Sequence, residues 1–383
     1  MRRWWERLAL VVLFAVVLEA TCRVEDVIRY GTPVWSRVRA KEDLIVLDDK
    51  GKHGRPHAQF GKWALNNLGM RGPDVSIAKP AGDVRVVVVG ASETFGLYES
   101  PGHDYPRLLE DSLRALVART PCARERPSDV EVLNAAIFGM SLPTVAQDLR
   151  LRVAPLHPDV VVAYPTPMYY LAPTTPDRTR PDSSGARDRL SPLSPLYPRT
   201  LDRLHDALKQ VVPEWLVGWM HAREEARLQR HEPRGWLFTT VPPDRLAAYE
   251  TDLRRLVGTV HAVHATPVLL THVNASMDNR LDAAWMEFWV HQYPRATGAA
   301  LIAFDSTADE VTVRVARDSG AALVDLASLA RRGLFTPYSE YYADYAHFTD
   351  SGAERVAAAI TPVVARTAHL VDDCAPSTVR AMQ

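Results

Sequence analysis

A short, unbroken run of β-branched residues, Arg85-Val-Val-Val-Val-Gly90, restricts the possible folds of this chain more than any other segment. An apolar run without polar alternation predicts a strand buried on both faces, as in a parallel sheet. Similar runs follow at residues 130–133, 159–163, 267–272 and 322–325. Helical patterns separate them at residues 104–118, 143–153, 244–264 and 308–318. A capping box at Ser351 and Glu354 predicts a last helix to about residue 369.

Five apolar strands that alternate with helices predict a three-layer α/β/α sandwich around a five-stranded parallel sheet, flavodoxin-like in its general architecture. Ligands in such sheets bind beyond the carboxyl ends of the strands. We therefore expect the chemistry just after residues 90, 134, 163, 272 and 325.

One stretch, residues 173–240, does not follow the alternation. It begins rich in Pro, Ser, Thr and Arg and continues as an Arg-rich helical segment, so we interpret it as a helical insertion after the third strand, with a lid as one possible role. Its tryptophans Trp215, Trp219 and Trp236 are expected to pack on the main domain; a glycan platform and a membrane-facing surface are the alternatives.

Composition excludes several classes of protein. The chain has 383 residues with 45 Lys and Arg against 46 Asp and Glu, a net charge of −1 that argues against a nucleic-acid-binding protein. Three cysteines exclude a disulfide-rich scaffold and a four-cysteine zinc site. His261 and His264 lie three residues apart on a predicted helix without a third ligand nearby, so we expect no metal ion, and no cofactor is required.

The amino-terminal residues 1–24 carry an apolar run, Leu8–Leu18, behind three arginines, Arg2, Arg3 and Arg7. A full membrane span needs about 20 apolar residues, so a run of eleven fits a signal-peptide core or a weak signal anchor. No good cleavage site follows, which favours a retained anchor; a helix packed on the domain is the alternative. The arginines predict an exported remainder, periplasmic or extracellular.

Three further regions follow this segment. Residues 25–80 are expected to form an extended lead-in, residues 81–370 the main domain, and residues 371–383 a tail. An exported compartment permits disulfides. Because the first and last crossover helices of such a sheet can be neighbours, we predict a bridge between Cys122 and Cys374.

Two segments carry candidate catalytic groups. Ser92 lies in Gly90-Ala-Ser92-Glu-Thr-Phe-Gly96, directly after the first strand, where its hydroxyl and backbone N–H can both face a ligand. Asp344 precedes His347 by three residues, just before the last helix. A carboxylate at this spacing can hold an imidazole in the tautomer that accepts a proton from serine. A nucleophile, a base and an orienting acid are thus available.

These segments resemble the SGNH/GDSL hydrolase family, over roughly residues 60–370 apart from the insertion. The first family block corresponds to Gly90-Ala-Ser92, the second to Asn134-Ala-Ala-Ile-Phe-Gly139, and the fifth to Asp344 and His347, followed by Phe-Thr-Asp-Ser-Gly352. The stretch Asn67-Leu-Gly-Met-Arg71 resembles the lead-in of anchored bacterial members. We expect Asn67, Gly69 and Arg71 to brace the edge of the site.

The resemblance implies a role for each matching residue. Ser92 would be the nucleophile, His347 the base and Asp344 its orienting acid, and the backbone N–H groups of Ser92 and Gly139 would belong to the oxyanion hole.

The chain departs from the family pattern at two places. Ala91 replaces an acidic residue, and the asparagine that the family places after the third strand is missing from Ala163-Tyr-Pro-Thr-Pro-Met-Tyr-Tyr170. We expect the hydroxyl of Thr166 or Tyr169 to replace this oxyanion donor; Asn274 is a weaker candidate.

The sequence therefore predicts a membrane-anchored serine ester hydrolase that forms an acyl-enzyme. Its expected substrate is an acyl ester, with an O-acetyl group on an envelope or extracellular glycan favoured by the resemblance. Two alternatives stay open: an O-acyltransferase of the same fold, and a non-catalytic glycan-binding protein on the hydrolase scaffold. Oligomeric state is not predicted.

Overall fold

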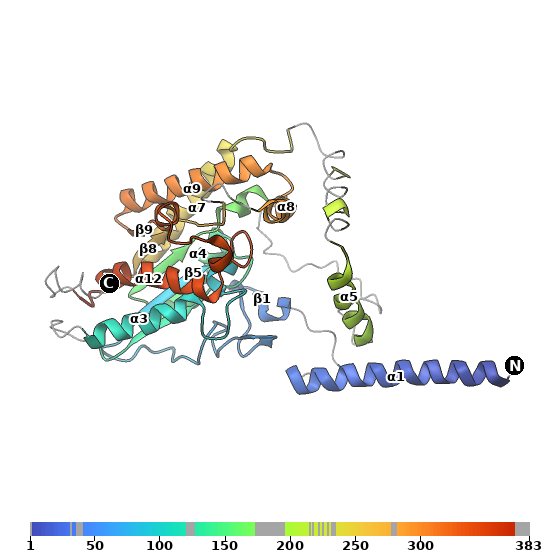
Figure 1. Cartoon of the computed structure of the whole chain (residues 1–383). Coiled ribbons are helices and arrows are strands. Elements are labelled where there is room, and N and C mark those ends of the chain that lie inside the picture. Colours follow the sequence, from blue (N-terminus) through green and yellow to red (C-terminus); the bar gives the residue numbers. More distant parts are fainter. Residues whose placement is uncertain are drawn as a thin grey trace.

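The computed structural model describes residues 2–30, 33–35, 41–119, 127–172, 196–213, 235–276 and 282–371, together with residues 216, 218–220, 223, 226, 227 and 230. A five-stranded sheet forms the centre of the molecule (Figure 1). Its strands are β6 (Val130–Asn134), β5 (Val84–Gly90), β7 (Val160–Tyr164), β8 (Thr266–Leu270) and β9 (Ala322–Val324), in this spatial order. Every neighbouring pair is parallel, so the predicted fold class is confirmed.

The valines of β5 explain why this strand is apolar on both faces. Val86 and Val88 point to one side, where α3 (Tyr105–Arg119), α10 (Leu326–Arg331) and α12 (Asp350–Thr367) cover the sheet. Val87 and Val89 point to the other side, which α4 (Leu142–Asp148), α7 (Pro243–Ala262) and α9 (Gly298–Ser319) cover. All four valines are at most 3% exposed. The sheet therefore lies between two helical layers, as Figure 1 shows.

Several boundaries differ from those predicted. The helix α9 begins at Gly298, ten residues before the predicted start, because Thr297 accepts a hydrogen bond from Ala300 and caps it there. A π-helical turn (Leu149–Val153) and a 3-10 turn (Ala154–Leu156) extend α4. The remaining elements are short: α2 (Ser92–Phe95), a 3-10 turn η4 (Pro167–Leu171), α8 (Ala283–Gln292) and α11 (Tyr338–Tyr341).

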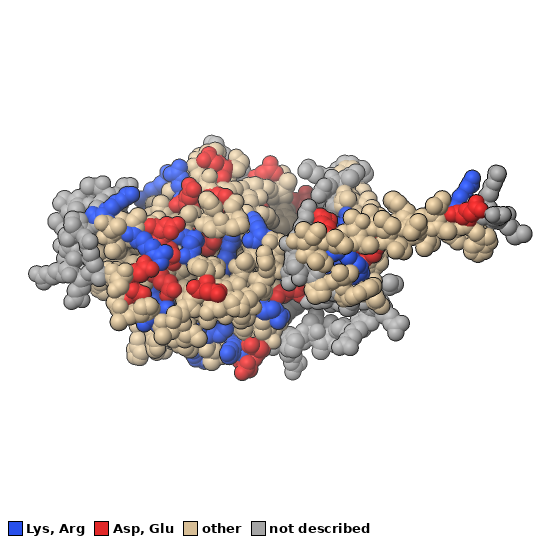
Figure 2. Space-filling model, turned by 90° about the horizontal axis from the view of Figure 1, so that it is seen from below, with Lys and Arg blue, Asp and Glu red and all other residues tan. Residues whose placement is uncertain are grey.

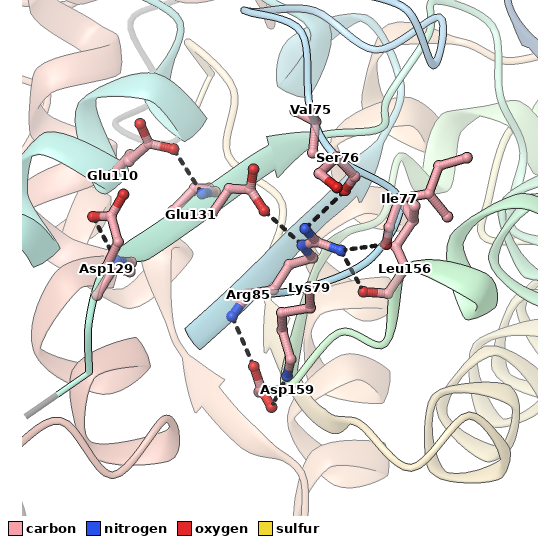
Figure 3. Close-up of polar contacts among 12 residues, drawn as sticks. Val75, Ser76, Ile77, Lys79, Arg85, Glu110, Asp129, Glu131, Leu156 and Asp159 are labelled. Atoms are coloured by element: carbon pink, nitrogen blue, oxygen red, sulfur yellow. Dashed lines mark hydrogen bonds and ion pairs between the residues drawn. The ribbon is translucent and has the colours of Figure 1, made fainter. Parts of the chain in front are cut away.

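A buried arginine connects the lead-in to the amino-terminal ends of the central strands (Figure 3). The Arg85 side chain, 0% exposed on β5, donates to the Glu131 carboxylate at 2.6 Å and to the carbonyls of Ser76 and Leu156 at 3.0 and 2.6 Å. Its backbone N–H donates to Asp159, which also pairs with Lys79. Because this cluster lies at the ends where the strands begin, it faces away from the expected site.

The lead-in has more regular structure than predicted. It contains a 3-10 turn (Lys41–Leu44) and two hairpins, formed by β1 (Ile45–Asp48) with β2 (Gly51–Gly54) and by β3 (Gln59–Phe60) with β4 (Trp63–Ala64). These strands have two to four residues each, so they are too short to show periodicity.

The amino-terminal helix α1 (Arg2–Tyr30) projects beside the domain (Figure 1). Within the part of the chain that the structure describes, no helix combines the length and apolar character needed to cross a membrane. In its second half, α1 contacts α5 (Arg199–Val211) of the insertion. The Glu19 carboxylate accepts from the backbone N–H groups of Arg199 and Thr200, each at 3.0 Å, and Asp26 pairs with Arg203 at 2.8 Å.

The other predictions for the insertion and the tail are tested only in part. Trp219 is 54% exposed, against the expectation of packing, because it lies on a part of the insertion outside the core; Trp236 is half-buried beneath the Arg295 guanidinium. Trp215, Cys122, Cys374 and residues 173–195 and 372–383 lie outside the described residues. The helices α3 and α12 are neighbours on one face of the sheet, as predicted.

Candidate active site

The nucleophile candidate Ser92 is the first residue of α2, directly beyond the carboxyl end of β5. The first amide groups of a helix have no acceptor within the helix, so they can face a ligand. Gly90 is required here, because a Cβ atom at this position would overlap the Thr94 side chain. The Thr94 hydroxyl is bonded to the Tyr105 hydroxyl at 2.8 Å, which fixes the turn against α3.

Two buried side chains hold this turn from the lead-in side. The Asn134 amide, at the end of β6, donates to the Thr94 carbonyl and to the Asp104 carboxylate, each at 2.9 Å. The Arg71 guanidinium donates to the carbonyls of Phe95, at 2.7 Å, and Gly96, and lies 3.3 Å from Asp104. The predicted bracing role of Arg71 is thus confirmed.

The base candidate His347 lies in a short loop before α12. Its Nδ1 is 2.8 Å from Asp344 Oδ2, and Asp344 Oδ1 also accepts from the backbone N–H groups of Ala346 and His347 at 2.9 Å. Burial raises the pKa of the Asp344 carboxyl, but these hydrogen bonds outweigh burial and leave it below its usual value. The ionised Asp344 can only accept, so Nδ1 carries the proton and Nε2 is the basic nitrogen.

Both segments face a common region. The Ser92 hydroxyl donates to the Glu93 carboxylate at 3.3 Å, and the charge of His347 acts on the same carboxylate. The Tyr98 ring packs edge-on against the His347 ring, with centroids 5.5 Å apart. Burial lowers the pKa of His347, but the Asp344 hydrogen bond and the charges of Asp344, Glu93 and Glu99 raise it, and the net shift is upward.

The candidate oxyanion donors lie at the ends of β6 and β7. Gly139 has φ +73°, a backbone conformation that residues with a side chain rarely adopt, so a substitution there would be strained. The Tyr169 hydroxyl lies near enough to the Ser92 side chain and the Gly139 backbone N–H to interact with both groups; burial nevertheless raises the pKa of this phenol. The Thr166 hydroxyl donates to Glu93 at 3.2 Å. Of the two predicted replacements, Tyr169 is therefore the one that interacts with Ser92.

The third candidate, Asn274, makes its side-chain hydrogen bonds to other residues. Its side-chain amide donates to Asp305, and its oxygen accepts from the Ser276 backbone N–H at 2.8 Å. Both the nitrogen and the oxygen of this amide are thus already hydrogen-bonded.

Sequence reasoning missed a buried charged cluster beside the nucleophile. His272, which follows β8, lies between Glu93 and Asp305, with nitrogen–oxygen distances of 3.6 and 2.8 Å. The sequence did predict chemistry just after residue 272. It did not predict the partners of His272, because they come from α2 and α9, which are distant in sequence. Among the described residues, no group of three or more His, Cys, Asp or Glu side chains is arranged to hold a metal ion.

No family model matches this sequence, and no curated protein is similar to it at a significant level. Among solved structures, the chain is similar to LAE5, an alpha/beta hydrolase enzyme from the metagenome of Lake Arreo, Spain. That likeness has 16% identity and a TM-score of 0.41, and covers 76% of this chain and 96% of that one.

Two other solved structures show a comparable likeness. The lipase/acylhydrolase from Enterococcus faecalis has 14% identity, coverage of 73% and 93% of the two chains, and a TM-score of 0.40. The acetylxylan esterase Axe2 from Geobacillus stearothermophilus has 14% identity, coverage of 74% and 94%, and a TM-score of 0.41. At these identities and scores, no activity is transferred from these proteins to this chain.

Proposed function

We propose that this protein is a serine esterase that hydrolyses an acyl ester through Ser92, His347 and Asp344. The observation that carries the proposal is the state of the His347 imidazole. Its Nδ1 is bonded to Asp344, while its buried Nε2 has no hydrogen-bond partner among the described residues. A base that is oriented on one side and unoccupied on the other is what a serine nucleophile requires.

The neighbouring carboxylate is a poor alternative base, although the Ser92 hydroxyl donates to it. Burial raises the pKa of Glu93, but its contact with His272 and the charge of His347 lower it to about 2. A base this weak gives little driving force for removing a serine proton, whereas a base that titrates near neutral pH is effective. His347 is therefore assigned the proton transfer.

The proposed reaction proceeds in two halves. Ser92 Oγ attacks the ester carbonyl as its proton passes to His347 Nε2, and a tetrahedral oxyanion forms. This intermediate collapses when His347 gives the proton to the departing alcohol, which leaves an acyl-Ser92. Water then attacks the acyl group, with His347 again taking a proton, and the carboxylic acid is released as Ser92 recovers its proton.

The oxyanion hole that we propose consists of the backbone N–H groups of Ser92 and Gly139 and the Tyr169 hydroxyl. Tyr169 is favoured over Thr166 because its hydroxyl lies near both Ser92 and Gly139, whereas the Thr166 hydroxyl donates to Glu93. A substrate oxyanion at this position would accept from the N–H groups of Ser92 and Gly139 and from the Tyr169 O–H.

The proposal is tested with a fluorophosphonate probe and with p-nitrophenyl acetate. The full chain should be labelled and should release nitrophenol, and both signals should vanish in Ser92→Ala and fall by about three orders of magnitude or more in His347→Ala. Ser319→Ala, at the far end of α9, is the matched control and should behave like the parent protein. A folded parent protein without labelling and turnover would contradict the proposal.

The substrate that we propose is an O-acetyl ester on a glycan, which the family resemblance favours. Acetylated xylooligosaccharides and peptidoglycan fragments, compared as substrates, test this class. Added acceptor sugar separates hydrolysis from acyl transfer, because a transferase would form acetylated acceptor faster than acetate.

We also propose that α1 attaches the protein to a membrane and that the catalytic domain is exported. The residues of α1 between Leu8 and Leu18 include side chains that are more than half exposed, among them Leu10 at 64% and Phe14 at 68%. In Figure 2 this helix projects with a mostly uncharged surface, unlike the mixed charges of the domain.

A further inference from the structure

The buried cluster beside Ser92 forms a continuous row of charged groups. Glu93, His272 and Asp305 are 3%, 1% and 1% exposed. Glu93 Oε1 lies 3.6 Å from His272 Nε2, and His272 Nδ1 lies 2.8 Å from Asp305 Oδ1. The other Glu93 oxygen, Oε2, accepts from the hydroxyls of Ser92 and Thr166 at 3.3 and 3.2 Å. The row therefore runs from α9 to the nucleophile.

Stability does not explain this row. Removing charges from water is costly, and a buried ion pair is often no more stabilising than apolar residues of similar volume. A row of buried charges that ends on the candidate nucleophile is better explained by an effect on the catalytic groups.

We propose that Glu93 is a positioning residue that serves His347 as a second carboxylate beside Asp344, and that the His272–Asp305 pair holds Glu93 in its ionised form. This inference rests on the proposed function of the site. Asp344 binds His347 at Nδ1, while Glu93 lies on the side of Ser92. The imidazolium that forms when Ser92 loses its proton would then be flanked by negative charge from both sides.

The charge states support this arrangement. Burial lowers the pKa of His272, but Asp305 and Glu93 raise it to about 10, and the pKa of Glu93 is lowered to about 2. Both groups therefore stay charged at every pH at which an esterase is normally assayed. Asp309, which accepts from the His272 backbone N–H at 2.8 Å, has a pKa raised well above its usual value by burial and by Asp305, so it adds little charge.

The other groups around the two residues are accounted for. The carboxyl groups that act on His347 are those of Asp344, Glu93 and Glu99, and the Tyr98 ring packs on it. Besides the two histidines, the ionisable groups that sense the Glu93 charge are the phenols of Tyr105, Tyr164, Tyr169, Tyr293 and Tyr345. Burial raises the pKa of each of these phenols, so they are neutral in the assay range.

Glu99 provides a matched control. It is 0% exposed and lies near enough to act on His347, but burial raises its pKa to about 8. At pH 7 and below, Glu99 is therefore largely a neutral acid, which glutamine mimics. Glu93→Gln removes a full charge near His347 in this pH range, whereas Glu99→Gln removes only the small ionised fraction of Glu99.

The test measures the pKa of His347 by NMR titration of its imidazole protons in the full chain, with Ser92→Ala as the background. Addition of Glu93→Gln should lower this pKa by on the order of one unit. Addition of Glu99→Gln should lower it by clearly less than Glu93→Gln does, because only a small fraction of Glu99 is ionised at pH 7 and below. In the active protein, the acid limb of kcat/KM for p-nitrophenyl acetate should move to lower pH by the same amount in Glu93→Gln, because His347 must be neutral to act as base.

Glu93→Asp keeps the charge and should retain most of the upward shift, which a purely structural role would not require. If Glu93→Gln does not fold, His272→Gln provides a second test of the Glu93 charge. Without its imidazolium partner, the pKa of Glu93 should rise. An unchanged His347 pKa in Glu93→Gln would overturn the inference. The NMR readout is independent of turnover, so it distinguishes this failure from the absence of esterase activity.

Discussion

At the scale of single residues, Tyr169 and Thr166 are the two candidates for the third oxyanion donor, and substitutions can distinguish them. Tyr169→Phe removes a hydroxyl that lies near both Ser92 and Gly139. Loss of one oxyanion donor typically costs about 10²–10³ in rate, so kcat for p-nitrophenyl acetate should fall by about that factor with little change in KM. Steady-state kinetics of the purified variant provide the measurement.

Thr166→Val is the matched variant, because its hydroxyl donates to Glu93 rather than to the nucleophile. It should reduce kcat by less than Tyr169→Phe. The opposite order of the two losses would assign the third donor to Thr166. Equal rates for Tyr169→Phe and the parent protein would show that Ser92 and Gly139 suffice.

At the scale of the elements, Arg85 gives a prediction about the sheet. Its buried guanidinium joins β5, β6, the lead-in and the turn before β7 through one side chain. Arg85→Met leaves the Glu131 carboxylate and several carbonyls without this donor, and breaking a buried pair costs about 3–5 kcal/mol. Urea denaturation should show a loss of this size in the free energy of unfolding.

The exposed pair between Arg317 and Asp318, 3.2 Å apart, serves as the control for Arg85. Arg317→Met should cost about 1 kcal/mol or less, since exposed ion pairs contribute little. The kcat/KM of folded Arg85→Met should stay near that of the parent protein, because the cluster lies at the opposite end of the strands from Ser92. Equal losses of stability in the two variants would contradict the structural role given to Arg85.

Prediction from sequence succeeded at the elements whose patterns are local. The run Val86–Val89 has no polar residue, which is typical of a strand covered on both faces, and this was sufficient to infer a doubly covered sheet. The hairpins of the lead-in were missed because strands of two to four residues have no measurable periodicity. The early start of α9 depends on the Thr297 cap, and a single threonine is common in loops.

The candidate site also has a part that local sequence predicted and a part that it did not. Asp344 and His347 lie three residues apart, so one loop brings them together and their spacing alone predicts the pair. Glu93, His272 and Asp305 come from three elements separated by 179 and 33 positions in the chain. Only the strand order brings them into contact, and each residue type is common on its own. The same holds for Tyr169, which η4 turns back toward Ser92.

At the scale of the whole molecule, the insertion is joined to α1 as well as to the sandwich. Glu19 accepts from the first backbone N–H groups of α5, and Asp26 pairs with Arg199 and Arg203. The apolar residues of α1 precede this contact in sequence. The segment proposed to attach to a membrane and the segment that contacts α5 are therefore separate parts of the helix. Residues 8–18 remain exposed while the later turns hold the insertion.

This separation allows membrane attachment to be tested without disturbing the contact with α5. Leu10→Glu with Phe14→Glu changes two exposed residues one turn apart and leaves Glu19 and Asp26 in place. Burial of each such side chain in an apolar phase is worth about 1.5–3 kcal/mol, so the double variant should bind vesicles at least about 100-fold more weakly. Flotation with vesicles of phosphatidylethanolamine and phosphatidylglycerol measures the bound fraction.

The control for vesicle binding is Leu47→Glu, an exposed apolar residue on β1 of the lead-in. It should float like the parent protein, and p-nitrophenyl acetate turnover should be equal in all three proteins because Ser92 lies on the sandwich. A parent protein that stays at the bottom of the gradient would remove the role proposed for α1. Flotation that survives both glutamates but is lost at Leu47 would place the membrane contact on the lead-in, and the exposed leucines of α1 would then need another partner.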